Sequence, residues 1–252
     1  MLAIIGGSGL TQLANLSITR REVIRTPYGE PSGALLFGEL TCKEIVFLAR
    51  HGYGHTVPPH KVNYRANMWA LKHVGVTQVI SVASVGGIRG DLGPGALVIP
   101  HQIIDYTYGR HHTYFDGDDG QVVHVDFTEP YTESLRQSLL AAAKAAGEEV
   151  ADGAVYACTQ GPRLESAAEI TRLERGGADV VGMTAMPEAV LARELGLEYA
   201  AINVVANWAA GRNDSKHSIQ FSSLEGQLQR SLGRVRDILE FSCSAAVRSC
   251  QA

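Results

Sequence analysis

Residues 1–10 read MLAIIGGSGL, an apolar run that ends in a cluster of glycines around one hydroxyl group. Ala3, Ile4 and Ile5 have the apolar, partly β-branched character of a buried strand. Glycines directly after a strand allow positive φ angles and let another molecule come close to the backbone. The stretch therefore predicts a buried first strand that ends in a turn able to contact a ligand.

Two familiar ligand-binding turns do not fit these ten residues. The dinucleotide fingerprint G-x-G-x-x-G fails because Gln12 stands at its last glycine, and the hydrolase elbow G-x-S-x-G fails because Leu10 stands at its last position. Two interpretations remain open. One is a cradle of backbone N–H groups for an oxyanion, with the Ser8 hydroxyl as a further donor, and the other is a tight turn without a ligand.

The composition is that of an ordinary globular protein. The chain has 252 residues, 45% of them hydrophobic and 19% charged, which is enough for a sizeable core. Its net charge of −4 offers no basic surface for a nucleic-acid backbone. No apolar stretch reaches the roughly 18–20 residues of a membrane span, and the N-terminus lacks a secretory leader pattern. We expect a cytoplasmic protein without nucleic-acid or membrane partners.

The cysteines and histidines give no metal-binding pattern. The four cysteines form no CxxC pair, which favours reduced thiols over a disulfide framework or a zinc ribbon. His51 and His55 have the spacing of a helical zinc motif, but Gly52 and Gly54 disfavour a helix and the glutamate of that motif is missing. We expect no metal.

Strand-like and helix-like segments alternate along the chain, which predicts an α/β fold. The expected strands are 2–5, 44–49, 78–85, 96–99, 154–158 and 198–205. The expected helices lie near 61–74, 131–146, 165–175, 187–195 and 222–247. No internal repeat or linker divides the sequence, so we expect one domain over residues 1–252.

Polar or glycine-rich segments occur at or near the ends of several expected strands. They are ARHGYGH (49–55), SVGGIRG (84–90), TQGPR (159–163), GMTAMPE (182–188) and NVVANWA (203–209). In an open α/β sheet, ligands bind outside the carboxyl ends of the strands. Arg50, with its permanent charge and planar fork of donors, is then a candidate anion anchor, and a surface ion pair is the alternative.

The irregular, aromatic segment 104–128 is typical of a binding or interface loop. Asn207, considered alone, fits a cap or a ligand contact equally well.

Seven strings in this sequence resemble the trimeric purine nucleoside phosphorylases, particularly the methylthioadenosine and methylthioinosine branch. They are IIGGSGL, ARHGYGHTVPPHKVNYRANMWALK, SVGGIRGDLGPG, YFDG, TQGPRLES, GMTAMPEAVLARELGL and AINVVANWAAG, and they cover most of residues 1–212 in order. The resemblance implies a three-layer α/β/α fold with a central mixed β-sheet and a homotrimer. It also implies a pentosyltransferase that uses inorganic phosphate as co-substrate and no cofactor.

The resemblance also implies roles for individual residues. Phosphate would be held by Ser8, Arg50, His51, the backbone around Ala83 and Ser84, and Thr184. Met183 would lie under the ribose, and Leu164 stands where adenosine-type enzymes present a phenylalanine against the base. His55 would flank the pocket for the 5′ substituent, and His124 would reach the site of a neighbouring subunit. Arg50, His51 and Asn207 are the expected catalytic residues.

Asn207 and Ala209 stand where adenosine-type members of the family have two aspartates. An asparagine amide can donate to O6 of hypoxanthine while its carbonyl accepts from a protonated N7. An aspartate suits the 6-amino group of adenine instead. The resemblance therefore implies a 6-oxopurine nucleoside as the substrate.

The favoured substrate is S-methyl-5′-thioinosine, cleaved in purine salvage to hypoxanthine and 5-methylthioribose 1-phosphate. Inosine or guanosine, and then methylthioadenosine, are the alternatives. Residues 214–224, including His217, Gln220 and Phe221, are expected to form the 5′ pocket. A purine-binding regulatory trimer without activity and a metallohydrolase also remain open.

Overall fold

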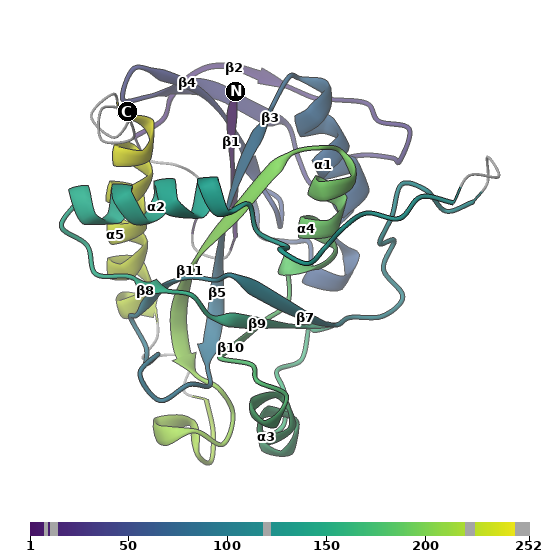
Figure 1. Ribbon diagram of the computed structural model, residues 1–252. Helices are drawn as coiled ribbons and strands as arrows, with labels where there is room; N and C mark the ends of the chain where they lie inside the picture. The colour runs from purple at the N-terminus through teal and green to yellow at the C-terminus, as the bar shows by residue number, and fades with distance from the viewer. Residues whose placement is uncertain (8–9, 11–14, 118–121, 220–224, 245–252) are drawn as a thin grey trace.

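The computed structural model describes residues 1–7, 10, 15–117, 122–219 and 225–244 of the chain. In this part, one mixed sheet runs through the molecule with helices on both of its faces (Figure 1). The strands are β1 (Leu2–Gly6), β2 (Ser17–Glu22), β3 (Leu35–Leu40), β4 (Lys43–Ala49), β5 (Gln78–Gly87), β6 (Leu97–Ile99), β7 (Gln102–Tyr106), β8 (Ala151–Asp152), β9 (Val155–Thr159), β10 (Val180–Gly182) and β11 (Glu198–Trp208). The helices are α1 (Tyr64–His73), α2 (Glu133–Ala145), α3 (Ala167–Arg175), α4 (Ala185–Glu194) and α5 (Glu225–Cys243), with 3₁₀ turns η1 (Pro59–Lys61) and η2 (Asn213–Ser215).

Alternate residues of β1 face the two helical layers, as the period of a strand requires. Ala3 and Ile5 belong to the core that includes residues of α1 and α4. Leu2 and Ile4 belong to the core that includes residues of α2 and α5. A fully buried central strand between two helical layers confirms the predicted three-layer α/β/α fold with a mixed sheet.

Four central strands run in the same direction. β1 pairs in parallel with β4 and β5, and β11 pairs in parallel with β5 along its whole length. Their carboxyl ends, which include Gly6, Ala49 and Gly87, therefore lie at one edge of the sheet. The other half of the sheet joins there, because β10 pairs with the last two residues of β5.

The predicted strands and helices are all present, with boundaries shifted by a few residues. Five strands were not predicted: β2, β3, β7, β8 and β10. β2 is exposed along its whole length and lacks apolar alternation, and β8 and β10 have only two and three residues. β7 corrects the predicted loop, since residues 104–106 continue a strand and the irregular segment begins at residue 107.

The irregular segment, here called the arm, comprises residues 107–117 and 122–128 of the described chain. Figure 1 shows that it runs outward from the body of the molecule beyond α1 and α4. No helix among the described residues is long and apolar enough to cross a membrane.

Candidate active site

A cavity of about 570 Å³ lies at the edge of the sheet where the parallel strands end. Ten of the residues predicted for the site line it: Arg50, His51, His55, Ala83, Ser84, Leu164, Met183, Thr184, Asn207 and Ala209. These residues come from segments up to about 160 positions apart, and the fold brings them into one chamber. Their individual roles stay predictions.

Two predicted residues do not line this cavity. His124 is exposed on the arm, and His217 is exposed after η2. Three others, Ser8, Gln220 and Phe221, lie outside the described residues. The predicted 5′ segment nevertheless contributes Ile219 to the cavity wall.

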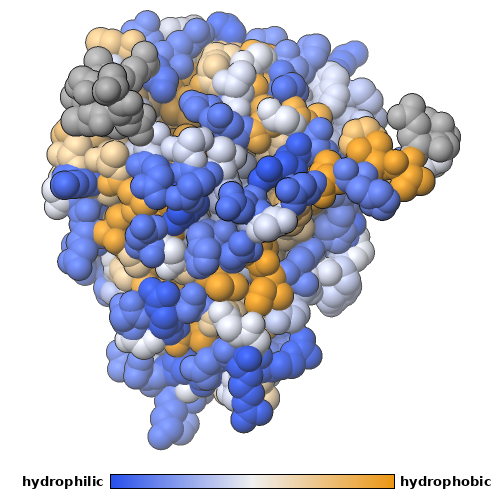
Figure 2. Space-filling model, viewed as in Figure 1, coloured by the Kyte–Doolittle hydropathy of each residue, from blue (hydrophilic) through white to orange (hydrophobic). Residues whose placement is uncertain are grey.

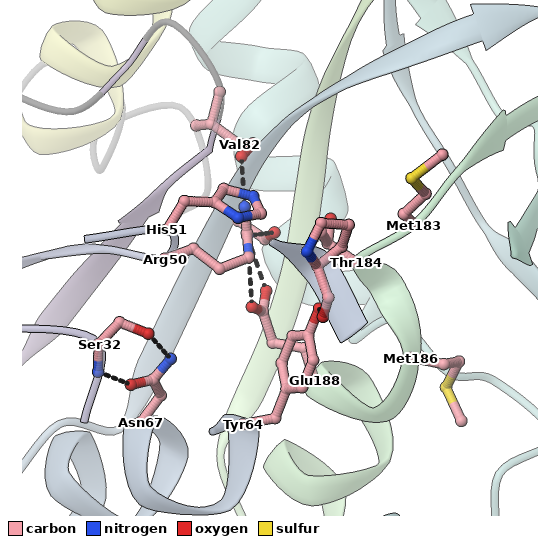
Figure 3. Close-up of polar contacts among 12 residues, drawn as sticks. Ser32, Arg50, His51, Tyr64, Asn67, Val82, Met183, Thr184, Met186 and Glu188 are labelled. Atoms are coloured by element: carbon pink, nitrogen blue, oxygen red, sulfur yellow. Dashed lines mark hydrogen bonds and ion pairs between the residues drawn. The ribbon is translucent and has the colours of Figure 1, made fainter. Parts of the chain in front are cut away.

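Arg50 is fully buried, and most of its donors are already used by the protein (Figure 3). Nε and Nη2 donate to the two carboxylate oxygens of Glu188 at 2.6 and 2.9 Å. Nη2 also donates to Ser81 Oγ at 2.7 Å, and Nη1 donates to the carbonyl of Val82 at 3.1 Å. The guanidinium fork therefore grips a carboxylate, and one N–H of Nη1 is left for an anion in the cavity.

This geometry corrects the interpretation of Arg50 as a fork presented to the ligand. Burial by itself lowers the pKa of Arg50, but the charge and hydrogen bonds of Glu188 offset this effect and raise the pKa above its ordinary value. Arg50 stays charged, and Glu188 neutralises that charge. The pair consequently offers an anion a directed donor with little net positive charge.

Glu188 is a site residue that the sequence analysis missed. Its side chain is 1% exposed, and besides Arg50 it accepts a hydrogen bond from the Tyr199 hydroxyl at 2.8 Å. The available signal was indirect: an arginine at the end of a buried strand requires a carboxylate partner. The sequence does not say which of the carboxylates that partner is.

Gly7 lets the backbone directly after β1 lie against Arg50. A Cβ atom at this position would meet the carbonyl oxygen of Val82 at 2.6 Å and Nη1 of Arg50 at 2.8 Å. Both distances are shorter than side-chain carbons tolerate. The glycine after β1 therefore allows close approach to the backbone, and the group that approaches is Arg50 of the same chain; contact of this turn with a ligand stays a prediction.

His51 is neutral in the folded protein at physiological pH. Burial, followed by the positive charge of Arg50, lowers the pKa of His51 from 6.5 to about 4. Nδ1 lies 2.8 Å from the carbonyl oxygen of Val57, which can only accept, so the proton sits on Nδ1. Nε2 then has a lone pair, and His51 is suited to accept a hydrogen bond from the O–H of a protonated phosphate.

The lowered pKa of His51 predicts a loss of stability in acid. The unfolded chain takes up this proton near pH 6.5 and the folded chain only near pH 4, so the stability that His51 contributes is complete above pH 6.5 and falls towards pH 4. The melting temperature of the wild type should therefore drop more steeply between pH 6.5 and 4 than that of His51→Asn, whose amide can still donate to Val57. Parallel melting curves for the two proteins across this range would contradict the assignment.

Thr184 begins α4 at the rim of the cavity. It is the N-cap residue, but its side chain makes no capping hydrogen bond. Its backbone N–H faces the Tyr156 hydroxyl at 3.4 Å. Because Met186 departs from helical angles, the regular helix starts only at Pro187. The first turn of the helix therefore does not use the Thr184 hydroxyl, which lies beside the Tyr156 hydroxyl at the wall of the cavity.

Two further polar side chains line the same cavity, one near the end of β11 and one in the loop between β9 and α3. Asn207, near the end of β11, donates through Nδ2 to the carbonyl of Trp208 at 2.7 Å, which leaves one amide N–H and Oδ1 for other partners. Glu165 accepts a hydrogen bond from the Thr159 hydroxyl at 2.6 Å. Glu165 was also missed, although it lies within the quoted string TQGPRLES; its position in the cavity becomes apparent only in the fold.

The structure gives no support to the histidine pair as a metal centre. The rings of His51 and His55 are tilted against each other with centroids 4.9 Å apart, and Nδ1 of His51 is already hydrogen-bonded. Among the residues that the structure describes, no three His, Cys, Asp or Glu side chains gather in a way that could hold an ion.

Comparison with known proteins gives consistent matches. The family model described as "Phosphorylase superfamily" matches residues 1–240. A protein of Pseudomonas syringae pv. tomato named "Probable S-methyl-5'-thioinosine phosphorylase" is 51% identical over 244 residues, which are 97% of this chain and 98% of that protein. A protein of Thermococcus kodakarensis named "Probable 6-oxopurine nucleoside phosphorylase" is 50% identical over 220 residues, 85% of this chain and 82% of that protein.

A solved structure matches the whole fold. It is methylthioadenosine phosphorylase from Schistosoma mansoni in complex with adenine, with a TM-score of 0.91 and 31% sequence identity. The match covers all of this chain and 92% of the other.

Proposed function

Because the chain belongs to the phosphorylase superfamily, we propose that it cleaves S-methyl-5′-thioinosine with inorganic phosphate to hypoxanthine and 5-methylthioribose 1-phosphate. The observation that carries this proposal is the combination of side chains in one cavity. Arg50, His51 and Thr184 offer contacts for an anion, while Asn207 and Glu165 offer an amide and a carboxylate for a base.

The amide and the carboxylate favour a 6-oxopurine over adenine. Hypoxanthine has a donor at N1 and an acceptor at O6, so the Glu165 carboxylate can accept from N1–H while the Asn207 amide donates to O6. Adenine has the opposite pattern, with an acceptor at N1 and a donor at N6. It would turn the N1 lone pair towards a carboxylate, which is costly in a site shielded from water.

The reaction needs no covalent intermediate with the protein. A phosphate oxygen bonds to C1′ as the C1′–N9 bond breaks, and the electron pair of that bond goes to the purine. The purine takes up a proton from water at N7, and the phosphate group gives up its own proton to water, so the protons balance. The transition state has positive charge on the sugar and negative charge on the purine. Asn207 would stabilise the leaving purine, because a fixed donor is most effective where charge develops.

Phosphate binding would contribute mainly by position. The last N–H of Arg50 Nη1 and the lone pair of His51 Nε2 come from the segment directly after β4, and the Thr184 hydroxyl comes from the start of α4, so the fold holds two distant segments around the anion. Fixing the second substrate in this way removes part of the entropy cost of a two-substrate reaction, an effect that reaches roughly 7–11 kcal/mol in well-oriented cases.

The preference for a 5′-methylthio group is supported by the apolar part of the cavity wall. Val57, Pro58, Pro59 and Ile219 line it, and the thioether is an apolar, polarisable group. Two relatives named as 6-oxopurine nucleoside phosphorylases, at 50% and 46% identity, favour inosine or guanosine as the second candidate. Both candidates require the same contacts to the base.

We further propose a homotrimer in the cytoplasm. The arm supports an interface between subunits because it exposes large apolar side chains: Tyr108 is 71% and Val122 is 80% exposed. Figure 2 shows such side chains along the arm, next to the residues drawn in grey. In such a trimer, His124 of the arm would complete the 5′ end of a neighbouring site. A stable, fully active monomer in sedimentation would contradict this arrangement.

The proposed activity is tested by release of free base. The protein is incubated with methylthioinosine, inosine or methylthioadenosine, with phosphate and without it, and with a chelator in a parallel set. We expect hypoxanthine release that requires phosphate, is fastest from methylthioinosine and does not change with the chelator. Adenine as the main product would contradict the base assignment, and no release from any nucleoside would favour a regulatory purine-binding protein.

A further inference from the structure

Arg110 lies at the base of the arm and behind the wall of the cavity, which it does not line. Nη1 donates to the backbone carbonyls of Met183 and Met186 at 2.8 and 2.6 Å. Nη2 donates to the carbonyls of Gln160 and Thr159 at 2.7 and 3.3 Å, and Nε donates to Gln160 Oε1 at 3.1 Å. A single side chain therefore binds the end of β9 and the start of α4 together.

These two segments continue directly into the walls of the cavity. Met183 itself lines it, and Thr184 follows in the chain. On the other side, Gln160 leads into the loop that places Leu164 and Glu165 in the cavity. The spacing between the Met183 wall and the Glu165 wall thus depends on the guanidinium that spans them.

The contacts of Arg110 differ in kind from those of Arg50. Its acceptors are carbonyl and amide oxygens, with the Tyr64 hydroxyl at 3.4 Å as a further contact. No carboxylate among the described residues lies within 4.0 Å of its nitrogens, whereas Arg50 is paired with Glu188. A planar guanidinium with donors fixed on three sides can span two backbone segments. A lysine at this position would keep the positive charge, but its ammonium group has its three donors at a single point and could not reach both backbone segments at once.

We propose that Arg110 is a positioning residue, which fixes the distance between the sugar wall at Met183 and the base wall at Glu165. The proposal rests on the proposed function. A shift of about 1 Å in such a wall lowers turnover by roughly 100-fold in known cases, because the reacting groups leave their productive geometry.

The test compares Arg110→Lys with Arg65→Lys. Arg65 also holds the arm, through Asp116 at 2.9 Å and the Thr113 carbonyl at 3.4 Å, but it contacts no residue of the cavity wall. We expect Arg110→Lys to lower kcat by roughly 100-fold with a change of less than about fivefold in KM for the nucleoside. The kcat of Arg65→Lys should stay within about twofold of the wild-type value, since Arg65 holds only the arm.

A rescue experiment separates positioning from general destabilisation. Arg110→Ala should regain activity with millimolar guanidinium and not with methylammonium, because only guanidinium restores the planar fork. Equal losses in the two lysine variants would overturn the proposal in favour of arm attachment. Full activity of Arg110→Lys, or equal rescue by both cations, would also overturn it.

The wild type in the same assay reports on the proposed function separately. If the wild type releases no base, the proposed function is wrong. The role of Arg110 is then tested by the binding of hypoxanthine, measured as a rise in melting temperature. Hypoxanthine should raise the melting temperature of the wild type and of Arg65→Lys, and it should raise that of Arg110→Lys less. The same rise in all three proteins would overturn the proposal.

Discussion

Replacing Glu188 by alanine is expected to lower the free energy of unfolding by about 3–5 kcal/mol, the cost typical of breaking a buried ion pair. The variant leaves the charge of the fully buried Arg50 side chain without its carboxylate. It also removes the acceptor of the Tyr199 hydroxyl. Phosphate binding should weaken as well, because the guanidinium loses two of the four hydrogen bonds that fix its orientation.

The measurement is urea unfolding at a fixed protein concentration, with the phosphate-induced rise in melting temperature as a second readout. Glu44→Ala is a suitable control. It breaks the ion pair between Arg20 and Glu44, whose side chains are more than half exposed and 3.6 Å apart, so its effect should stay within about 0.5 kcal/mol. If the free energy of unfolding of Glu188→Ala is no lower than that of the control, the ion pair between Arg50 and Glu188 does not stabilise the protein as proposed.

Asn207→Asp is expected to lower kcat on methylthioinosine by roughly 100- to 1000-fold, the usual effect of removing one donor from a developing anion. The change replaces an amide that can donate to O6 with a carboxylate that repels it. Activity on methylthioadenosine should fall less or rise, because a carboxylate can accept from the 6-amino group. The ratio of the two activities is therefore the decisive quantity.

The ratio is measured as hypoxanthine release against adenine release under the same phosphate concentration. Asn213→Asp makes the same chemical change at an exposed position in η2 and should leave the ratio unaltered. Glu165→Gln provides an independent check on the same end of the cavity, since it removes the acceptor for N1–H. An unchanged ratio in Asn207→Asp would show that this residue does not determine the preference between hypoxanthine and adenine.

Most of the fold could be predicted because its central strands are continuous apolar runs. β1 and β11 are buried over most of their length, and an apolar segment of this kind between two helical patterns predicts a buried strand. β2 could not be predicted, since none of its residues is buried and its place in the sheet comes from pairing with β3. The limits of the arm also depended on pairing, because β7 is recognisable only beside β9.

The candidate site was predictable as a set of residues and less so as a set of contacts. Parallel strands end at one edge, so the polar groups that follow them had to meet. Which residue each of these groups contacts is decided by the tertiary structure. Arg50 and Glu188 are 138 positions apart, and no spacing in the sequence links them. The same holds for Arg110, since four of its acceptors are backbone carbonyls, which any sequence would offer.

Because Gly7 has no side chain and is closely packed, it limits which substitutions this part of the sequence can accept, in evolution or in redesign. Every other amino acid would bring a carbon against Val82 and Arg50 at distances that the backbone cannot absorb without moving. Gly7, the carbonyl of Val82 within β5 and the buried guanidinium of Arg50 thus pack as one unit. A library that diversifies this enzyme for new nucleosides should keep that unit constant and vary lining residues that are exposed, such as Leu164, whose side chain is 38% exposed.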